Sequence, residues 1–389
     1  MLIVCLPGGG AETSARSVAR ALDSKGWNVA LLVVTQSQPG IIQSADGEVT
    51  QLVGRPGNLH YWLRRLVPGG RRWAGVLRGF ETALLVQKMA RRLAKPGEAL
   101  IDTPEGLSFP TGRRRRYPVC VTLHSSAFCW KENLGVALTP GDRCDKAAER
   151  RQLLAAARIY APSRAVALHA QQSLGLPMER LDVFPYLVDE ELLRRPVSES
   201  ASSELRILHV GRPSLWKGAQ YLVDAIPSVV QQCPRAVFTF AGWSAQDPEA
   251  AAMLAALPEE LVQGHVRMLG FVPHDEVIAH YDQADISVVP SLWDNSPFTV
   301  YEAMARGCAV VASAVGGIPE LVADGDGGLL VPPKDSRALA EAIIALASDR
   351  SFLQEQKRRS RQRALEVFEP GMILKKQMGF YTQAWERRR

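Results

Sequence analysis

Short apolar runs alternate with helix-length segments through the second half of this chain. The runs are rich in β-branched residues and lie at 206–210, 236–240, 266–271, 286–289, 309–312 and 329–331. Between the first two runs, apolar residues recur at helical spacing: Leu222, Ala225, Ile226, Val229 and Val230. Continuous apolar strands separated by such helices are typical of a parallel sheet covered on both faces. We therefore predict a doubly wound, Rossmann-like α/β domain in this half.

The first half repeats the alternation with weaker signals. An apolar strand at 2–6 precedes a glycine run and an amphipathic helix from about Thr13 to Lys25. Further strands are expected at 27–34, 99–101, 119–123, 158–161 and 181–184, with helices at 80–93, at 146–156 and after a cap at Ser163. Residues 36–79 are rich in Gly, Pro and Arg and predict loops with a short strand. This pattern predicts a second Rossmann-like domain.

The domain boundaries follow from length and composition. A chain of 389 residues exceeds the size at which a single core keeps growing, so two domains are expected. Residues 189–204 turn charged and then Ser-rich, a composition typical of linkers. We place the first domain at 1–192, a linker at 193–204 and the second domain at 205–365. The last segment, 366–389, is a basic helix with apolar and aromatic residues, and we expect it to pack back on the first domain.

Composition excludes several classes of protein. A hydrophobic content of 47% and a charged content of 22% describe an ordinary globular protein. No apolar run approaches the roughly 18 residues that span a bilayer, and the chain start resembles a strand more than a signal peptide, so we expect a cytoplasmic location. The six cysteines show no CxxC pair and no metal-ligand spacing, which argues against a zinc site or disulfides: Cys5, Cys120, Cys129, Cys144, Cys233 and Cys308.

Charge is unevenly distributed along the chain. The net charge of +6 combines +10 up to Arg195, −6 from Pro196 to Leu365 and +2 from Glu366 onward. The counts of basic against acidic residues are 27 against 17, 14 against 20 and 5 against 3. The basic first half includes the pairs Arg64-Arg65, Arg71-Arg72 and Arg91-Arg92 and the run Arg113–Arg116. Either this half meets an anionic partner or surface, or its arginines only form solvated faces.

A first candidate site lies at 292–307, after the strand at 286–289. Ser296 suits a helix N-cap and Pro297 the first helical position. The N–H groups of Phe298 and Thr299 would then favour a phosphate. Glu302, one turn further, could reach a sugar hydroxyl beside that phosphate. The alternative is a capped helix with one solvated acid.

A second candidate site, His209 to Gly218, follows the first strand of the same domain. Ligands of open α/β sheets bind beyond the carboxyl ends of the strands, where this loop places Arg212 and Lys217. A guanidinium and an ammonium suit phosphate oxygens, although two surface cations would give the same sequence. Both loops belong to one sheet. Together with hydroxyl acceptors at Asp294 and Glu302, they suit a pyrophosphate flanked by two hydroxylated rings, as in a nucleotide sugar.

These motifs closely resemble the family 4 retaining glycosyltransferases of the GT-B fold, which have two Rossmann-like domains facing a central cleft. Gly211-Arg212 and Lys217-Gly218 match the family's phosphate loop, and Asp294 and Glu302 match its acidic pair. The segments 302–322 and 327–335 look like the family's most recognisable stretches. In the first half, Gly9-Gly10 resembles the acceptor-side glycine loop and 121–124 the strand that ends in a sugar-contacting histidine, with 161–163 a further marker. The resemblance covers nearly the whole chain.

The resemblance implies a role for each matching residue. Arg212 and Lys217 would hold the diphosphate and Glu302 the nucleotide ribose, while Asp294 and His124 would contact the transferred sugar. Substrate binding is further expected at Gly9, Gly10, Gly211, Asn295, Ser296, Phe298 and Thr299. The chain departs from the family in having Asp at 294, where Glu is usual, and Asn295-Ser296-Pro297 in place of Gly-Phe-Gly. In the second domain, the family's glycine-rich turn after the second strand is reduced to Gly242-Trp243-Ser244.

The expected reaction is sugar transfer to a hydroxyl group with retention of anomeric configuration, a feature implied by resemblance only. No metal or other cofactor is expected, in line with the metal-independent GT-B group that the sequence resembles. The acceptor would be a glycan, glycolipid or other glycoconjugate, and the basic first half would suit an anionic one or peripheral contact with the inner membrane face. The alternatives are a GT-B relative that epimerises or phosphorolyses a sugar nucleotide, a silent scaffold, or a basic protein that binds glycan or nucleic acid. Nucleic acid is disfavoured, because the arginine run has only Tyr117 beside it.

Overall fold

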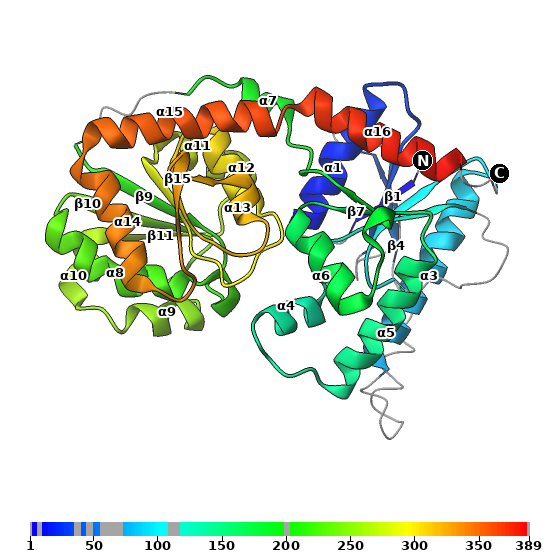
Figure 1. Cartoon of the computed structure of the whole chain (residues 1–389), viewed down its shortest axis with the longest axis horizontal. Coiled ribbons are helices and arrows are strands. Elements are labelled where there is room, and N and C mark those ends of the chain that lie inside the picture. Colours follow the sequence, from blue (N-terminus) through cyan, green and yellow to red (C-terminus); the bar gives the residue numbers. More distant parts are fainter. Residues whose placement is uncertain are drawn as a thin grey trace. The chain divides into compact units, whose positions relative to one another are not determined.

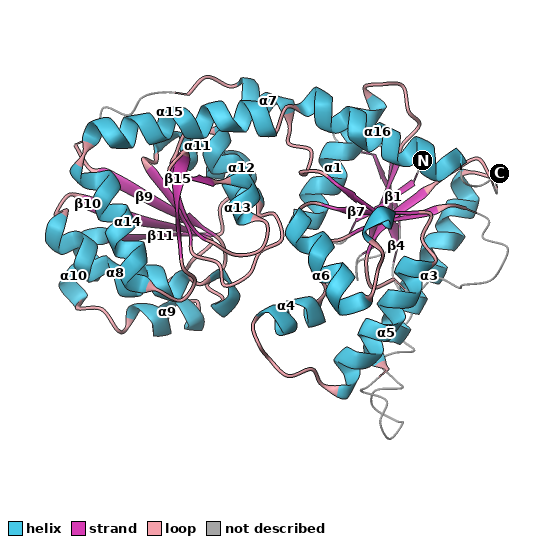
Figure 2. Ribbon diagram, in the orientation of Figure 1, coloured by secondary structure: helices cyan, strands magenta, loops and turns pink. Residues whose placement is uncertain are grey.

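The computed structural model describes residues 2–5, 10–34, 40–43, 50–54, 73–95, 97–107, 117–197 and 203–386. The chain divides into two compact units (Figure 1). Unit 1 comprises Met1–Leu187 together with Pro370–Arg389, and unit 2 comprises Val188–Glu369. In each unit the strands of a single sheet lie between helices (Figure 2). None of the described helices is long and apolar enough to cross a membrane.

Unit 1 contains a sheet with the strand order β3-β4-β2-β1-β5-β6-β7-β8. Its strands are β1 (Leu2–Cys5), β2 (Ala30–Val34), β3 (Gly40–Gln43), β4 (Thr50–Gly54), β5 (Ile101–Pro104), β6 (Val119–Thr122), β7 (Arg158–Ala161) and β8 (Leu181–Val183). All neighbouring pairs are parallel except β3 and β4, an antiparallel pair at the edge. The sequence predicted one short strand in this region and no antiparallel pair.

The helices among the described residues of unit 1 are α1 (Gly10–Asp23), α3 (Ala74–Leu93), α4 (Ala127–Asn133), α5 (Pro140–Leu154), α6 (Arg164–Leu174) and α16 (Pro370–Glu386). The Ser163 cap is confirmed, since its hydroxyl oxygen accepts from the N–H of Val166. Helix α5 begins six residues before the predicted 146, because Thr139 and Asp142 form a reciprocal capping box and Pro140 follows the cap. Helix α3 likewise begins at Ala74 and not at residue 80.

Unit 2 contains a fully parallel sheet with the order β11-β10-β9-β12-β13-β15-β14. Its strands are β9 (Leu205–Val210), β10 (Ala236–Ala241), β11 (Val266–Gly270), β12 (Ile286–Val289), β13 (Ala309–Ser313), β14 (Ala323–Asp324) and β15 (Gly327–Val331). Six of them match the predicted runs to within two residues, and only β14 was missed.

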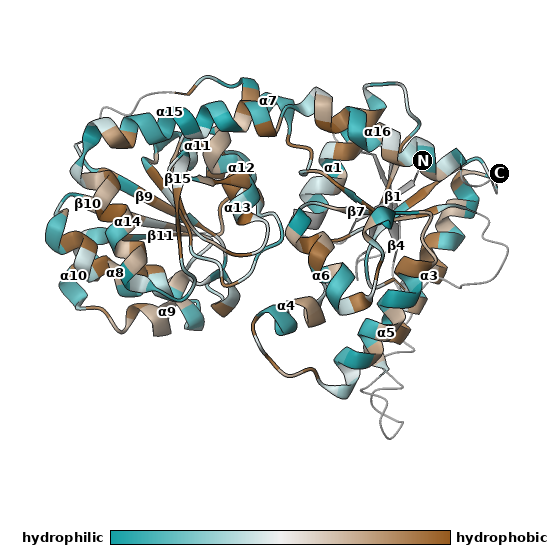
Figure 3. Ribbon diagram, viewed as in Figure 1, coloured by the Kyte–Doolittle hydropathy of each residue, from teal (hydrophilic) through white to brown (hydrophobic). Residues whose placement is uncertain are grey.

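The main helices of unit 2 are α7 (Glu190–Arg194), α8 (Ala219–Gln232), α9 (Pro248–Leu254), α10 (Glu259–His265), α11 (His274–Gln283), α12 (Phe298–Ala305), α13 (Ile318–Leu321), α14 (Ser336–Ser348) and α15 (Arg350–Val367). The five apolar residues predicted on one face of α8 are all buried in the core. The helices carry both hydrophobic and hydrophilic residues, as expected of helices that cover a sheet (Figure 3).

The chain passes from unit 1 to unit 2 at Leu187–Val188, earlier than the linker predicted at 193–204. Part of that segment is packed, because the buried guanidinium of Arg306 donates to the carbonyl oxygens of Leu192, Arg195 and Pro196 at 3.2, 2.8 and 2.6 Å. Arg361 also donates to the carbonyl oxygen of Leu193, so arginine side chains fix part of a segment whose composition is typical of linkers. Residues 198–202 of the predicted linker lie outside the described residues.

Candidate functional site

The two candidate loops of unit 2 meet at one edge of its sheet. Strands β9 and β12 are parallel neighbours, so their carboxyl ends lie at the same edge. The N–H of Leu292 donates to the carbonyl oxygen of Trp216 at 2.8 Å and joins the two loops. Gly218 has a φ of 64°, and a Cβ there would lie 1.8 Å from the carbonyl oxygen of Pro290. Glycine at 218 is therefore required by the close approach of the loops.

Lys217 and Asp294 form an ion pair across this junction. The Lys217 Nζ lies 2.8 Å from Asp294 Oδ2, and the exposed fractions of the two side chains are 31% and 6%. The sequence assigned the two residues to different parts of a ligand, and the structure brings them into direct contact. A partly exposed ammonium beside a buried carboxylate keeps further N–H groups for a phosphate, while the carboxylate keeps acceptor capacity for a hydroxyl.

Glu302 has a partner that the sequence reasoning missed. His274, the first residue of α11, places its Nε2 2.9 Å from Glu302 Oε1. The hydrogen bond that His274 donates to Glu302 raises the pKa of His274, so the imidazole carries positive charge at higher pH than a free histidine. The available signal was the position of this histidine in the segment after strand β11, beyond the carboxyl end of that strand.

The start of α12 differs from the prediction by one residue. Pro297 is in the N-cap position with an extended backbone (φ −72°, ψ 126°), and Phe298 is the first helical residue. The hydroxyl of Ser296 does not cap the helix, because it lies 2.6 Å from the Tyr301 hydroxyl in the interior. The predicted cap at Ser296 is therefore wrong. Asn295 is also buried, and Phe298 and Thr299 occupy the first two helical positions.

The loop that follows β13 contacts the backbone of Asp294. The N–H of Gly317 donates to the carbonyl oxygen of Asp294 at 3.0 Å. Gly316 has a φ of 53°, and a Cβ there would lie 1.8 Å from the same oxygen. The sequence placed this loop in a family-like segment but gave it no role.

Arg212 lies beside Gly211 in the loop after β9 and is exposed. It lines a hollow of about 1010 Å³ that also includes Trp216, Asp224 and Asp247. Behind the loop, burial lowers the pKa of His209 to about 4, so its imidazole is neutral, and its Nδ1 lies 3.1 Å from the carbonyl oxygen of Val288. The exposed guanidinium of Arg212 and the ammonium of Lys217 therefore give this loop its positive charge.

In unit 1, His124 follows strand β6 as predicted. Its Nδ1 lies 2.8 Å from the Tyr186 hydroxyl, and its backbone N–H donates to Glu105 Oε2 at 2.8 Å. Burial lowers the pKa of His124 to about 4, so the imidazole is neutral and serves as a hydrogen-bonding group. Burial also raises the pKa of Glu105 to about 7. The sequence did not point to Glu105 as a site residue. Gly10 begins α1, whereas Gly9 and Arg113–Arg116 lie outside the described residues.

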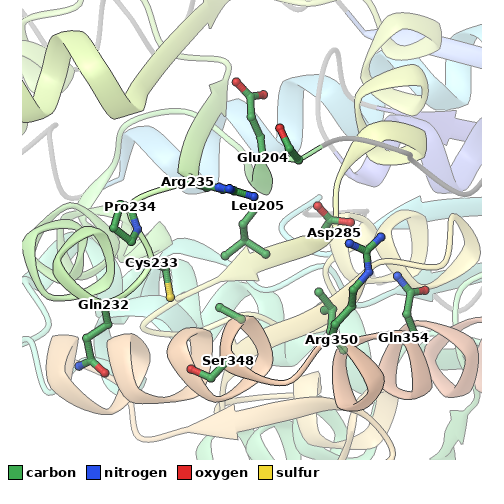
Figure 4. A pocket seen from close by; sticks show the side chains of 13 residues that line it. Glu204, Leu205, Gln232, Cys233, Pro234, Arg235, Asp285, Ser348, Arg350 and Gln354 are labelled. Carbon is green, nitrogen blue, oxygen red and sulfur yellow. The ribbon is translucent and has the colours of Figure 1, made fainter.

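A second hollow, of about 390 Å³, opens at the amino-terminal edge of the unit 2 sheet (Figure 4). Leu205 and Asp285 line it where strands β9 and β12 begin, together with Arg235 and Arg350. None of the predicted site residues lines this hollow. The predicted site residues of unit 2 belong instead to segments that follow the carboxyl ends of the strands.

Known proteins share both the sequence pattern and the fold. A family described as "Glycosyltransferase Family 4" matches residues 8–192, and one described as "Glycosyl transferases group 1" matches residues 204–349. Over 202 residues, the chain is 30% identical to the amylovoran biosynthesis glycosyltransferase AmsK of Erwinia amylovora, covering 50% of this chain and 49% of the relative. The chain spans about half the length of the curated relatives it matches.

Solved structures resemble the whole chain at lower identity. Sucrose-phosphate synthase of Thermosynechococcus elongatus superposes with a TM-score of 0.76 at 22% identity, covering 100% of both chains. The Anabaena protein HepE, solved in complex with UDP and glucose, gives a TM-score of 0.68 at 18% identity and covers 98% of each chain. At these identities the likeness shows the fold, which is GT-B. Together with the two family matches, it establishes that this chain belongs to the family 4, group 1 glycosyltransferases of the GT-B fold.

Proposed function

We propose that this protein is a retaining, metal-independent glycosyltransferase that moves a sugar from a nucleoside-diphosphate sugar to a hydroxyl acceptor. The observation that carries the proposal is the set of charges at the carboxyl edge of the unit 2 sheet. Two carboxylates with cationic partners, Asp294–Lys217 and Glu302–His274, and the exposed Arg212 all belong to segments that follow strands β9, β11 and β12 of this sheet. Cations suit a diphosphate, and buried carboxylates suit sugar hydroxyls.

The proposed mechanism depends on stabilising the leaving group. Departure of a nucleoside diphosphate builds negative charge on the pyrophosphate and oxocarbenium character on the sugar. Arg212, Lys217 and the N–H groups at the start of α12 would stabilise the first charge without protonation. Asp294 would accept hydrogen bonds from the transferred sugar and Glu302 from the ribose. Because each carboxylate already has a fixed partner, the site needs little reorganisation when the donor binds.

For the acceptor we propose a glycan, glycolipid or other glycoconjugate held by the first domain, and we propose that His124 contacts the transferred sugar. The name of AmsK refers to biosynthesis of amylovoran, and the excess of basic residues up to Arg195 suits an anionic acceptor or a membrane surface. The corresponding location is the cytoplasm, with peripheral contact to the inner face of the membrane.

The donor proposal is tested by measuring thermal stabilisation and hydrolysis across UDP-, GDP- and ADP-sugars. At least one donor is expected to raise the melting temperature of the wild type and to be hydrolysed. Glu302→Gln and Lys217→Ala should weaken the affinity for the donor about tenfold or more, so both the rise in melting temperature and the hydrolysis should become smaller. Glu341→Gln, a similar substitution at an exposed residue of α14, should change neither.

The two kinds of failure are distinguishable. If no nucleotide sugar stabilises the wild type, the proposed activity is wrong. If Glu302→Gln and Lys217→Ala bind and turn over the donor like the wild type, only the assignment of the site is wrong.

A further inference from the structure

We infer that His274 is a positioning residue for the donor nucleotide: it fixes the carboxylate of Glu302 and supplies a positive charge that makes donor binding depend on pH. The inference rests on the proposed role of Glu302 in holding the ribose. His274 belongs to neither of the two loops that the family pattern identifies, and its contact with Glu302 joins the start of α11 to the middle of α12.

The geometry separates the roles of the two side chains. The Glu302 side chain is 9% exposed, so its carboxylate has little freedom, whereas His274 is 60% exposed. His274 Nε2 contacts Oε1 and Tyr281 also hydrogen-bonds to the Glu302 side chain, and the remaining lone pairs of the carboxylate can accept from a ligand hydroxyl. Losing this contact would free the carboxylate to rotate, and part of the ribose contact would be lost with it.

The electrostatic role follows from what the site is expected to bind. A nucleoside diphosphate carries negative charge, and Asp294 and Glu302 would repel it if they had no cationic partners. Lys217 offsets Asp294 at 2.8 Å, and His274 offsets Glu302 at 2.9 Å. The two pairs differ in one respect: a lysine stays charged through neutral pH, whereas a histidine titrates there.

The groups that face His274 set the pH range. Its hydrogen bond to Glu302 raises the pKa most, Asp275 and Asp189 add to this, and partial burial opposes it. Tyr281, packed near Glu302, stays neutral because burial and Glu302 hold its pKa well above 10. The raised pKa means that His274 keeps its proton up to a pH above the ordinary 6.5 of histidine. Nucleotide affinity should then be constant at acidic pH and fall as the pH rises through this raised value.

The test measures the Kd of UDP, GDP and ADP by calorimetry from pH 6 to pH 9. For a nucleotide that binds the wild type, affinity should fall about three- to tenfold across this range, and His274→Gln should abolish most of that dependence. His274→Gln can still donate a neutral hydrogen bond to Glu302. Its affinity should therefore match the wild type within about twofold at pH 9 and be about three- to tenfold weaker at pH 6. His274→Ala should bind more weakly at every pH.

Two controls keep the outcomes separate. His280→Gln makes the same substitution on the same helix and should retain the wild-type pH profile. Melting temperatures of all variants show whether α11 is still folded, and an NMR titration of the wild-type His274 ring, with and without nucleotide, follows its protonation directly. If a nucleotide binds and Glu302→Gln weakens it, but His274→Gln keeps the wild-type profile, this inference is overturned and the proposed function stands. If none of the three nucleotides binds the wild type, both are overturned.

Discussion

Asp294 shows how the site is maintained at the level of single residues. A carboxylate that is 6% exposed loses most of its hydration, and its ion pair with Lys217 compensates for that loss. Removing one partner of such a pair leaves the other buried without compensation, which costs more than the pair itself contributes. Lys217 therefore has a structural role in addition to its proposed contact with phosphate.

Lys217→Ala should lower the free energy of unfolding by about 1–2 kcal/mol, a value reduced from that of a fully buried pair because Lys217 is about one-third exposed. Adding Asp294→Asn should recover part of the loss, since no buried charge then remains unpaired. Urea denaturation of the single and double variants measures this, with the exposed Lys375→Ala as the control. A double variant as unstable as Lys217→Ala would show that the buried charge is not the cause.

Asp102 gives unit 1 a stability that depends on pH. Burial raises its pKa to about 6, against hydrogen bonds donated by Tyr381 and Thr122 that lower it. The folded pKa lies above the unfolded value near 3.8, so this group stabilises the fold fully below pH 3.8 and ceases to do so as the pH rises through 6. The size of the effect is on the order of 2–3 kcal/mol.

Asp102→Asn keeps an acceptor for both donors and removes the titration. Relative to the wild type, the variant should therefore gain stability between about pH 4 and pH 7. Denaturation of both proteins across this range measures the difference, and other groups such as Glu105 cancel in it because both proteins contain them. A difference that does not change with pH would contradict the role of Asp102.

At this scale the sequence predicted residues whose chemistry is local to a motif, and missed those that act through tertiary contacts. Arg212 and Lys217 lie in the loop after β9, and Asp294 and Glu302 lie in the loop and helix after β12, so the strand order of one sheet brings the two segments together. His274 is 28 positions from Glu302, and only the packing of α11 beside α12 joins them. Ser296 is a residue type that often caps helices, but its hydroxyl forms a hydrogen bond with the buried Tyr301 hydroxyl instead.

At the level of elements, the site depends on a loop that contributes no side chain to it. The turn after β13 places Gly316 and Gly317 against the carbonyl oxygen of Asp294. Gly316→Ala would bring a Cβ 1.8 Å from that oxygen, so either the turn or the Asp294 loop must move. Gly325 has a φ of 76°, and a Cβ at this position would meet nothing within 4 Å, so it carries the same backbone requirement without the collision.

Gly325→Ala should therefore cost about 1 kcal/mol, the cost of a left-handed backbone alone, and leave donor binding unchanged. Gly316→Ala should cost about 2–4 kcal/mol and weaken donor binding as well. Chemical denaturation and nucleotide titration of both variants separate the two effects. Equal losses in the two variants would mean that the close approach to Asp294 is unimportant.

Buried strands were predicted more closely than the antiparallel edge pair and the polar start of α5. Strands such as β9, β12 and β13 lie inside a sheet covered by helices, so their apolar runs are continuous and their limits were predicted closely. The edge pair of β3 and β4 lies in a stretch rich in Gly and Pro and gave only a weak signal. Helix α5 was predicted too short because its first turns are polar, and only its capping box marks where it begins.

At the level of the whole molecule, the chain passes between the two units twice, at Leu187–Val188 and at Glu369–Pro370. The second passage gives unit 1 its last helix, α16, which contacts α1, β6 and β7. Four large side chains of α16 are buried in this unit: Ile373, Leu374, Phe380 and Tyr381. Unit 1 therefore needs a segment that comes after the whole of unit 2 in the sequence.

A chain that stops at Glu369 should consequently lose unit 1 and keep unit 2. Burying each of the four side chains contributes about 1.5–3 kcal/mol, so their removal takes away an amount comparable to the entire stability of a typical domain. The truncation also removes the Tyr381 hydroxyl from the buried Asp102. Hydrogen exchange should show lost protection in β6 and β7 and retained protection in β9, β12 and β13, while a chain that stops at Glu386 should match the full protein. Retained protection in β6 and β7 of the shorter chain would show that unit 1 folds without α16.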